Sequence, residues 1–242
     1  MKTIKSLVIV ALTVFAVGAC AQETIKEEMA KKYPEVKIEK ITKTAYGNLY
    51  EVFSGGEIFY TDEKANFLLL GTLVDTKTRV NISEARLQKL TAIKFDDLPF
   101  EHAIKLVRGN GSRRIAIFAD PNCGYCKKFE QDVNTTDNLT AYIFMYPILA
   151  QDSIAKSKSI WCSTDRLKSW QDQMLREKAP TGPGTCETPT DIVLALGRKM
   201  NITGTPTTFF EDGERISGAL PKDRIEAKIV AAKMPPTVEA KK

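Results

Sequence analysis

The segment 115–129 constrains the fold of this chain more than any other stretch. Its apolar start (IAIF) predicts a buried strand, the turn DPN follows, and an amphipathic stretch comes next. Two cysteines, Cys123 and Cys126, lie three residues apart where the turn gives way to that stretch. The order predicts a strand, a turn and a helix, with Cys123 at the helix N-terminus and Cys126 one turn inside.

A cysteine at a helix N-terminus has distinctive chemistry. Free backbone N–H groups and the positive end of the helix dipole favour a thiolate over a thiol at Cys123. The thiolate is the form that attacks disulfides, and Cys126 is placed to close a disulfide with Cys123 or to resolve a mixed one. The pattern therefore predicts a redox-active dithiol.

Other uses of a Cys-x-x-Cys pair fit less well. A structural zinc site needs four ligands, but Cys162 and Cys186 do not form a second closely spaced pair, and His102 is the only histidine. A c-type haem needs histidine directly after the second cysteine, where Lys127 stands. We therefore expect no metal and no cofactor, and we interpret His102 as an ordinary surface or packing residue. A purely structural disulfide within the motif remains an alternative, against which the strand-to-helix context argues.

The N-terminus, residues 1–21, has the pattern of a secretory signal peptide. Lysines precede an uncharged apolar run at 7–17, which is too short to span a bilayer, and small residues follow it. An A-x-A site at 19–21 would release a mature chain. The run 17–20 also resembles a lipobox, which would leave Cys20 acylated. We expect the soluble product, because valine is a weak match at the first lipobox position.

Charge and cysteine number narrow the partners and the compartment. Loss of the leader removes two lysines and no acidic residue, so the formal charge of +5 falls by two. So small a net positive charge on a chain of 242 residues predicts no nucleic-acid partner. Four cysteines remain in the mature chain, an even number that suits an oxidising compartment.

Residues 22–80 are expected to form a small α+β unit, joined to the rest by a polar, mostly helical linker at 81–111. Asn81 or Ser83 is expected to cap the linker helix, and Gly55-Gly56 predicts a tight hairpin turn. A unit of this size buries little surface, so we expect dimerisation through an exposed strand edge. The expected elements are a helix at 23–33 and strands at 36–42, 48–53, 57–61 and 66–72.

A second domain is expected at 112–236, before a tail at 237–242. A buried-type strand at 139–147 follows the Cys-x-x-Cys helix, and a largely helical insertion at about 153–200 comes next. Cys162 and Cys186 flank a loop in this insertion. A structural bridge between them is predicted to pin two helical arms, to contribute roughly 3 kcal/mol through loop closure and to leave the neighbouring Trp161 in the core.

The run 204–210 predicts a special backbone feature. Pro206 begins a β-branched and aromatic strand in which it cannot donate to the ladder, so an edge position or a special turn is expected. The bond from Thr205 to Pro206 is a candidate cis peptide. A hairpin turn, a short strand at 215–218 and a closing helix at 221–232 are expected after it.

These elements make a thioredoxin fold with a helical insertion, and the chain resembles the bacterial periplasmic disulfide-bond isomerase family of DsbC and DsbG. With the leader, the small N-terminal domain and the linker, the resemblance covers nearly the whole mature chain. Gly124-Tyr125 favours DsbC, because DsbG typically has Pro-Tyr. The matching features are Phe118 and Asp120 before Cys-Gly-Tyr-Cys, Ile160-Trp161-Cys162, Cys186 and Gly204-Thr205-Pro206.

The resemblance implies an α+β protein with a cystatin-like N-terminal dimerisation domain, a helical linker and a thioredoxin-fold catalytic domain. It implies a periplasmic homodimer that reshuffles or reduces incorrect disulfides in misfolded exported proteins and is kept reduced by a DsbD-type membrane protein. Cys123 and Cys126 would be catalytic. A dithiol oxidase and a DsbG-like thiol reductase or chaperone are the alternatives. The residues expected to bind substrate or to tune the sulfurs are Gly124, Tyr125, Thr205 and Pro206.

Two positions depart from the family pattern. Lys127 stands where members often have histidine, which removes an imidazole that could tune the thiolate. Ile117, six residues before Cys123, stands where thioredoxins proper carry a buried aspartate. Deprotonation of Cys126 must then rely on water or on another group, and a reductant like thioredoxin is less expected.

Overall fold

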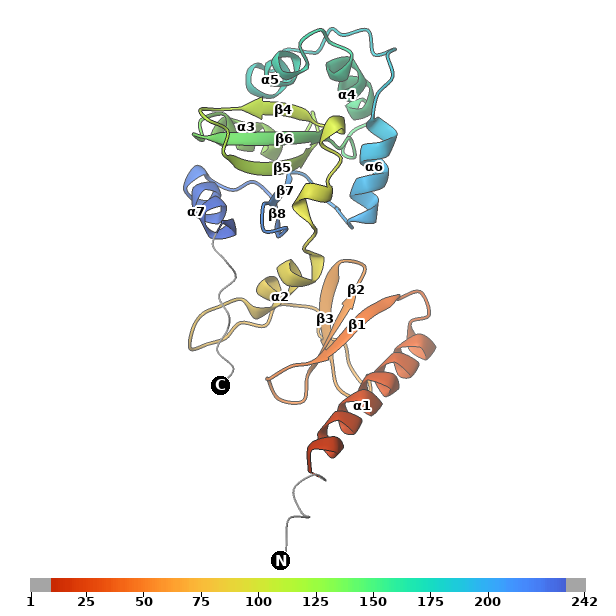
Figure 1. The fold of residues 1–242 in the computed structure, drawn as a ribbon. Helices are drawn as coiled ribbons and strands as arrows, with labels where there is room; N and C mark the ends of the chain where they lie inside the picture. Colours follow the sequence, from red (N-terminus) through yellow and green to blue (C-terminus); the bar gives the residue numbers. More distant parts are fainter. Residues whose placement is uncertain (1–9, 234–242) are drawn as a thin grey trace, which may run out of the picture. The chain divides into compact units, whose positions relative to one another are not determined.

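The computed structural model describes residues 10–233, and their side chains from residue 21 onward. The predicted leader at 1–21 therefore falls outside the described side chains but for its last residue, and the predicted tail at 237–242 lies outside the described residues. The chain divides into two compact units between Leu90 and Thr91, and each mixes helices with a sheet, so the fold is α+β as expected (Figure 1). None of the helices within 10–233 has both the length and the apolar character needed to cross a membrane.

In the first unit a helix packs on a three-stranded antiparallel sheet of order β1-β2-β3. Ile25 and Met29 of the helix are buried together with Tyr50 and Val52 of the central strand. The predicted helix at 23–33 matches the C-terminal part of a longer helix, which ends one residue earlier. The elements are α1 (Val10–Lys32), β1 (Ile38–Lys43), β2 (Tyr50–Ser54), β3 (Glu57–Thr61) and α2 (Ile82–Thr91).

The turn between β2 and β3 has the conformation that its glycines predict. Gly55 and Gly56 have φ angles of 60° and 83°, and Ser54 pairs with Glu57 across the two-residue turn. The strand predicted at 66–72 is wrong, because only an isolated bridge between Tyr60 and Leu69 forms there. Upstream of that bridge, the carboxylate of Asp62 accepts hydrogen bonds from the backbone and side-chain nitrogens of Asn66, which favours a turn over an extended strand.

The predicted linker at 81–111 is only partly helical. Asn81 caps α2 as expected, its Oδ1 accepting the backbone N–H of Glu84 at 3.0 Å. Two short 3₁₀ turns, η1 (Phe95–Asp97) and η2 (Phe100–His102), then precede a strand, β4 (Ile104–Val107). The expectation of a mostly helical linker is wrong at β4, where alternate side chains are buried and the strand pairs with β6 of the second unit.

The second unit has a five-stranded sheet of order β4-β6-β5-β7-β8. Its central pair, β5 and β6, is parallel, while β4, β7 and β8 run antiparallel to their neighbours. The predicted strand, Cys-x-x-Cys helix and strand are all present. The strands are β5 (Arg113–Ala119), β6 (Leu139–Met145), β7 (Thr207–Phe210) and β8 (Arg215–Ser217), and the helices are α3 (Gly124–Asn134), α4 (Ser153–Trp161), α5 (Arg166–Arg176), α6 (Thr190–Lys199) and α7 (Lys222–Ala232).

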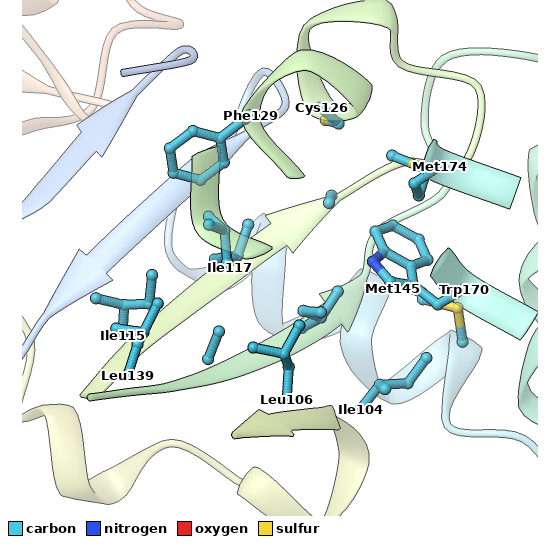
Figure 2. Close-up of a cluster of buried hydrophobic side chains, with 14 of the residues drawn as sticks. Ile104, Leu106, Ile115, Ile117, Cys126, Phe129, Leu139, Met145, Trp170 and Met174 are labelled. Carbon is cyan, nitrogen blue, oxygen red and sulfur yellow. The ribbon is translucent and has the colours of Figure 1, made fainter. Parts of the chain in front are cut away.

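Alternate residues of β5 belong to two different cores. Ile115 and Ile117 join a cluster with residues of α3, α5 and α7, which Figure 2 shows around Cys126 and Phe129. Phe118 lies in a second cluster with Val193 of α6 and stacks on Phe144. Because successive side chains of a strand point to opposite faces, both faces of this sheet are covered, and α3 is fixed on one of them.

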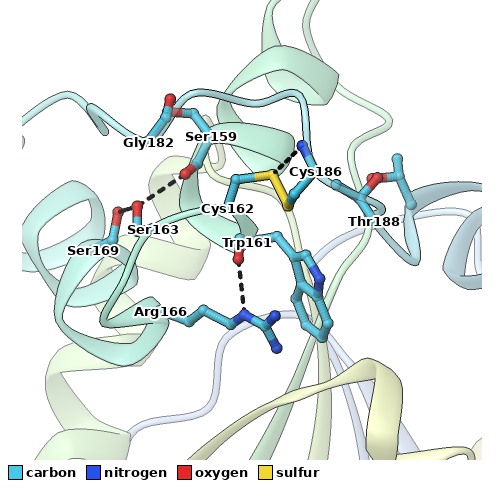
Figure 3. The surroundings of a disulfide bond; sticks show 10 residues. Ser159, Trp161, Cys162, Ser163, Arg166, Ser169, Gly182, Cys186 and Thr188 are labelled. Atoms are coloured by element: carbon cyan, nitrogen blue, oxygen red, sulfur yellow. Dashed lines mark hydrogen bonds between the residues drawn. A yellow bond between two sulfur atoms is a disulfide. The ribbon is translucent and has the colours of Figure 1, made fainter.

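The helical insertion comprises α4, α5 and α6, and Cys162 and Cys186 form a disulfide in it with their Cα atoms 5.7 Å apart (Figure 3). This is the pair for which a bridge is expected from the sequence. Trp161 is buried, as expected, and the Arg166 guanidinium lies over its ring at 3.9 Å from the centroid. The end of α4 is therefore tied both to the loop before α6 and to the start of α5.

Candidate active site

The turn after β5 presents Cys123 as the N-cap of α3. The backbone N–H of Cys123 donates to the carbonyl of Asp120 at 3.0 Å, which closes the turn. Cys123 itself is extended, with φ −74° and ψ 114°, and its sulfur accepts the backbone N–H of Cys126 at 3.1 Å. The sulfur thus occupies the place that a serine or aspartate oxygen takes in an ordinary cap, where negative charge is favoured.

A second segment brings a carbonyl to the same sulfur. The bond between Thr205 and Pro206 is cis, as the sequence predicts, and β7 begins directly after it at Thr207. The thiol of Cys123 donates to the carbonyl oxygen of Thr205 at 3.3 Å. Residues that are far apart in the sequence therefore meet at one sulfur, which lies between a helix N-terminus and the start of a strand.

The two middle residues of the Cys-x-x-Cys motif are exposed to solvent, whereas its two cysteines are buried. Cys123 and Cys126 are both reduced, and they are only 3% and 2% exposed, whereas Tyr125 is 73% exposed. Gly124 is also exposed, and the space where a Cβ would stand on it is open. A disulfide must therefore reach Cys123 past a turn that carries little side-chain bulk at Gly124 and a large aromatic ring at Tyr125.

The surroundings of Cys126 disfavour its ionised form. Burial raises the pKa of the Cys126 thiol, and its contact with Cys123 raises it further. The backbone of Asp120 and the hydroxyl of Thr205 act in the opposite direction and are the weaker influences. At neutral pH Cys126 is therefore held as a thiol, and it has to lose a proton before it can attack a mixed disulfide.

The comparisons with known proteins agree with this geometry. A model of the disulfide bond isomerase N-terminal domain matches residues 16–84, and a model of a thioredoxin-like domain matches 100–233. A probable thiol:disulfide interchange protein DsbC of Bordetella pertussis is 42% identical over 207 residues, which are 86% of this chain and 74% of that protein. The thiol:disulfide interchange protein DsbC of Escherichia coli is 24% identical over 81% of this chain and 82% of its own length.

The chain belongs to the DsbC family of thiol:disulfide interchange proteins. A crystal structure of a disulfide interchange protein from Neisseria gonorrhoeae is similar as well, with 36% identity and a TM-score of 0.55. The similar region covers 57% of this chain and 100% of the Neisseria gonorrhoeae chain. The resemblance to DsbC proteins found in the sequence is thereby confirmed, and so is the thioredoxin-like domain.

Two other residues that stand out in the sequence, Lys127 and His102, make contacts outside the pair of cysteines. Lys127, the departure from the frequent histidine of DsbC proteins, pairs with the exposed Glu177 at 2.9 Å. His102 lies in η2, 3.8 Å from the carboxylate of Glu101, and has no part in the thiol site as described. Within residues 10–233, no cluster of three or more histidine, cysteine or acidic side chains is arranged to hold a metal ion.

Sequence reasoning missed one unusual residue of this DsbC-type domain, Glu130. It lies one turn after Cys126 on α3 and is 3% exposed, and its Oε1 has no hydrogen-bond partner. Burial raises the pKa of the Glu130 carboxyl to about 7. The indole N–H of Trp170 partly opposes this rise, although it makes no hydrogen bond of normal geometry. The spacing from Cys126 was the available signal, because residues four apart share a helix face.

Proposed function

We propose that this chain is a disulfide isomerase of exported proteins, with Cys123 as the attacking sulfur and Cys126 as the resolving one. The observation that supports this most is the setting of Cys123, whose sulfur accepts the Cys126 N–H at a helix N-terminus and faces the Thr205 carbonyl. A donor N–H stabilises negative charge on sulfur, and the thiolate is the reactive species.

The chemistry runs through a mixed disulfide. The Cys123 thiolate attacks one sulfur of an incorrect disulfide, a Cys123–substrate bond forms, and the other substrate sulfur leaves as a thiolate. That thiolate attacks another disulfide of the substrate and frees a different substrate thiolate, which then attacks the substrate sulfur bound to Cys123. A new substrate disulfide forms and Cys123 leaves as the thiolate, which completes isomerisation. Alternatively the Cys126 thiolate displaces the substrate, which leaves reduced while Cys123 and Cys126 become a disulfide.

The backbone beside the cis bond is proposed to hold the substrate. Thr205 and Pro206 lie directly before β7, and the Thr205 carbonyl is within reach of the attacking sulfur. An extended substrate segment that paired with this backbone would bring its own disulfide to Cys123, in the manner of an added strand. Gly124 gives the approach room, and the exposed Tyr125 ring offers an apolar contact.

A test of the isomerase separates it from the alternatives. The reduced protein is expected to restore activity to a scrambled multi-disulfide substrate without added oxidant, whereas a dithiol oxidase would act only when it starts from its disulfide form. A chaperone would suppress aggregation equally well in the double variant Cys123→Ala/Cys126→Ala. Reshuffling that persisted in the double variant would contradict the proposal.

The release of substrate by Cys126 is expected to depend on pH. Because burial holds the pKa of Cys126 above its usual range, the thiolate fraction rises about tenfold per pH unit in the range below that pKa. The displacement rate from a preformed mixed disulfide on Cys123 should rise by about that factor for each unit between pH 6 and 9. Quenched-flow measurement of the leaving thiol checks this, and a pH-independent rate would contradict it.

We also propose that the first unit forms a homodimer. β3 is an edge strand, and a groove of about 450 Å³ lies beside it, lined by Ile58, Phe59 and Leu87 among others. Leu70, at the rim of this groove, is 80% exposed. The outer edge of β3 bonds to Leu69 at Tyr60, and an edge strand beside exposed apolar side chains favours pairing with a second chain.

The change Leu70→Glu is expected to weaken this dimer at least about tenfold, because a carboxylate would have to lose water in an apolar interface. Analytical ultracentrifugation of the mature chain at micromolar concentration measures the shift. Ile192→Glu places the same change at a half-exposed site of the second unit and should leave the dimer intact. A parent protein that sediments as a monomer would rule out the dimer.

The proposed setting is the periplasm, reached through the predicted leader, with a soluble mature chain. Lipid attachment at Cys20 is the alternative, and mass measurement of the mature protein distinguishes the two. An isomerase needs its dithiol form, so the proposal includes a membrane reductant of the DsbD type as a partner, and misfolded exported proteins as substrates.

A further inference from the structure

The carboxylate of Asp120 is buried and engaged on both oxygens. The residue is 0% exposed and lies between the end of β5 and the Cys-x-x-Cys motif. One oxygen accepts the backbone N–H of Asn122 and the hydroxyl of Ser153, each at 2.8 Å. The other accepts the backbone N–H groups of Ile148 and Leu149 at 2.7 and 2.9 Å.

These contacts join the turn that carries Cys123 to the helical insertion. Ser153 is the first residue of α4, and Ile148 and Leu149 lie in the loop that leads to it from β6. The backbone of Asp120 completes the connection, because its carbonyl accepts the N–H of Cys123 at 3.0 Å. One residue therefore binds the nucleophile's own amide on one side and the start of the insertion on the other.

The two residues that follow Asp120 in the turn also form hydrogen bonds with the helical insertion. The side chain of Asn122 donates to Asp152 and Ser153, and accepts from Lys156 at 2.6 Å. The carbonyl of Pro121 accepts the side-chain amide of Gln173 of α5 at 3.0 Å. All three residues before Cys123 thus contact α4 or α5 or the loop before them, and Asp120 is 0% exposed.

We propose that Asp120 is a positioning residue of the thiol site, whose carboxylate fixes the turn against the insertion and so sets the place of the Cys123 sulfur. The proposal rests on the proposed function, and it goes beyond it by giving the insertion a role in catalysis. The sulfur has two close partners from different segments, the Cys126 N–H and the Thr205 carbonyl. A small shift of the turn changes both contacts, and misplacement of a reacting atom by about 1 Å can cost up to about a hundredfold in rate.

A carboxylate suits this place better than its amide. Three of the four donors are backbone N–H groups, which cannot turn round to accept. In Asp120→Asn, the side-chain NH₂ must face at least one of them, which places donor against donor in a buried site. The turn should then move, although the side chain keeps its size.

The test compares Asp120→Asn with its parent in a Cys126→Ala background, where Cys123 is the only free thiol of the mature chain. The rate of mixed-disulfide formation with 5,5′-dithiobis(2-nitrobenzoate) is measured from pH 5 to 9, at a temperature where circular dichroism shows both proteins folded. We expect a rate at least about tenfold lower, with an altered pH profile. Asp172→Asn is the matched control, since Asp172 is a buried carboxylate of the same insertion that pairs with Lys168 and Arg176 of its own helix.

A lowered melting temperature with an unchanged rate and pH profile would overturn the proposal, because Asp120 would then serve folding alone. If Asp120→Asn does not fold, Ser153→Ala replaces it, since it removes one donor and leaves the carboxylate in place. A rate reduced about threefold is expected there, and an unchanged rate would again overturn the proposal. If Cys123 of the parent protein does not react with the disulfide of the reagent, the result would instead contradict the proposed function.

Discussion

The substitution Cys123→Ala is expected to reduce the reshuffling of a scrambled multi-disulfide protein to the uncatalysed rate, a loss of at least about a hundredfold. No other group described at the site can take its place. Cys126 is buried with its pKa raised, so at neutral pH it supplies little thiolate. The measurement is recovery of the substrate's activity over time in a glutathione buffer, with folding of the variant checked by circular dichroism.

The matched variant Cys126→Ala should behave differently. It keeps the sulfur that attacks, so it should still reshuffle disulfides, but it should accumulate the mixed disulfide because the resolving sulfur is gone. Equal loss in both single variants would mean that the two sulfurs act only as a pair, as in a dithiol oxidase or reductase. Retention of reshuffling in Cys123→Ala would contradict the assignment of the nucleophile.

The second large effect is a pH dependence of stability that comes from Glu130. The folded-state pKa of this carboxyl is about 7, raised by burial from 4.5. Between these values the folded chain keeps a proton that the unfolded chain loses, so the free energy of unfolding falls as the pH rises. The loss is complete above pH 7 and amounts to about 3 kcal/mol, because each pKa unit corresponds to about 1.4 kcal/mol.

Glu130→Gln should abolish this part of the pH dependence and leave a protein that is more stable than the parent at pH 8. Urea unfolding at pH 4.5 and pH 8, followed by tryptophan fluorescence, measures it in the right domain, since Trp161 and Trp170 are the only tryptophans and both belong to the second unit. Glu177→Gln, at an exposed site, should keep the dependence. A Glu130→Gln protein that lost stability with pH as the parent does would show that Glu130 is not the source.

Most of what could be predicted from the sequence follows from local patterns of residue types. The strand before Cys123, the helix after it and the cis bond at Pro206 follow from residue types over a few positions, and all are present. The strand β4 was missed because it has four residues within a polar region and exists through its pairing with β6. The strand expected at 66–72 does not form, because the Asp62 carboxylate accepts the backbone N–H of Asn66 and so stabilises a turn there.

The missed features of the site depend on packing between distant segments. Nothing near Glu130 in the sequence shows that α5 will cover it with Trp170, so it looks like an ordinary helical glutamate. Three of the four donors to the Asp120 carboxylate come from about thirty residues further along the chain, from Ser153 of the insertion and from the loop that leads to it. The thioredoxin position for a buried acid is occupied here by Ile117, and the buried carboxyl of Glu130 lies instead on α3.

The most direct measurement of the central claim is the capture of the covalent intermediate. Cys126→Ala, reduced and mixed with a scrambled disulfide protein, is quenched with an alkylating reagent, separated without reductant and digested for mass spectrometry. A disulfide-linked peptide pair that joins Cys123 to a substrate cysteine is the predicted result. A Cys123 found unlinked while the substrate is reshuffled would contradict the account.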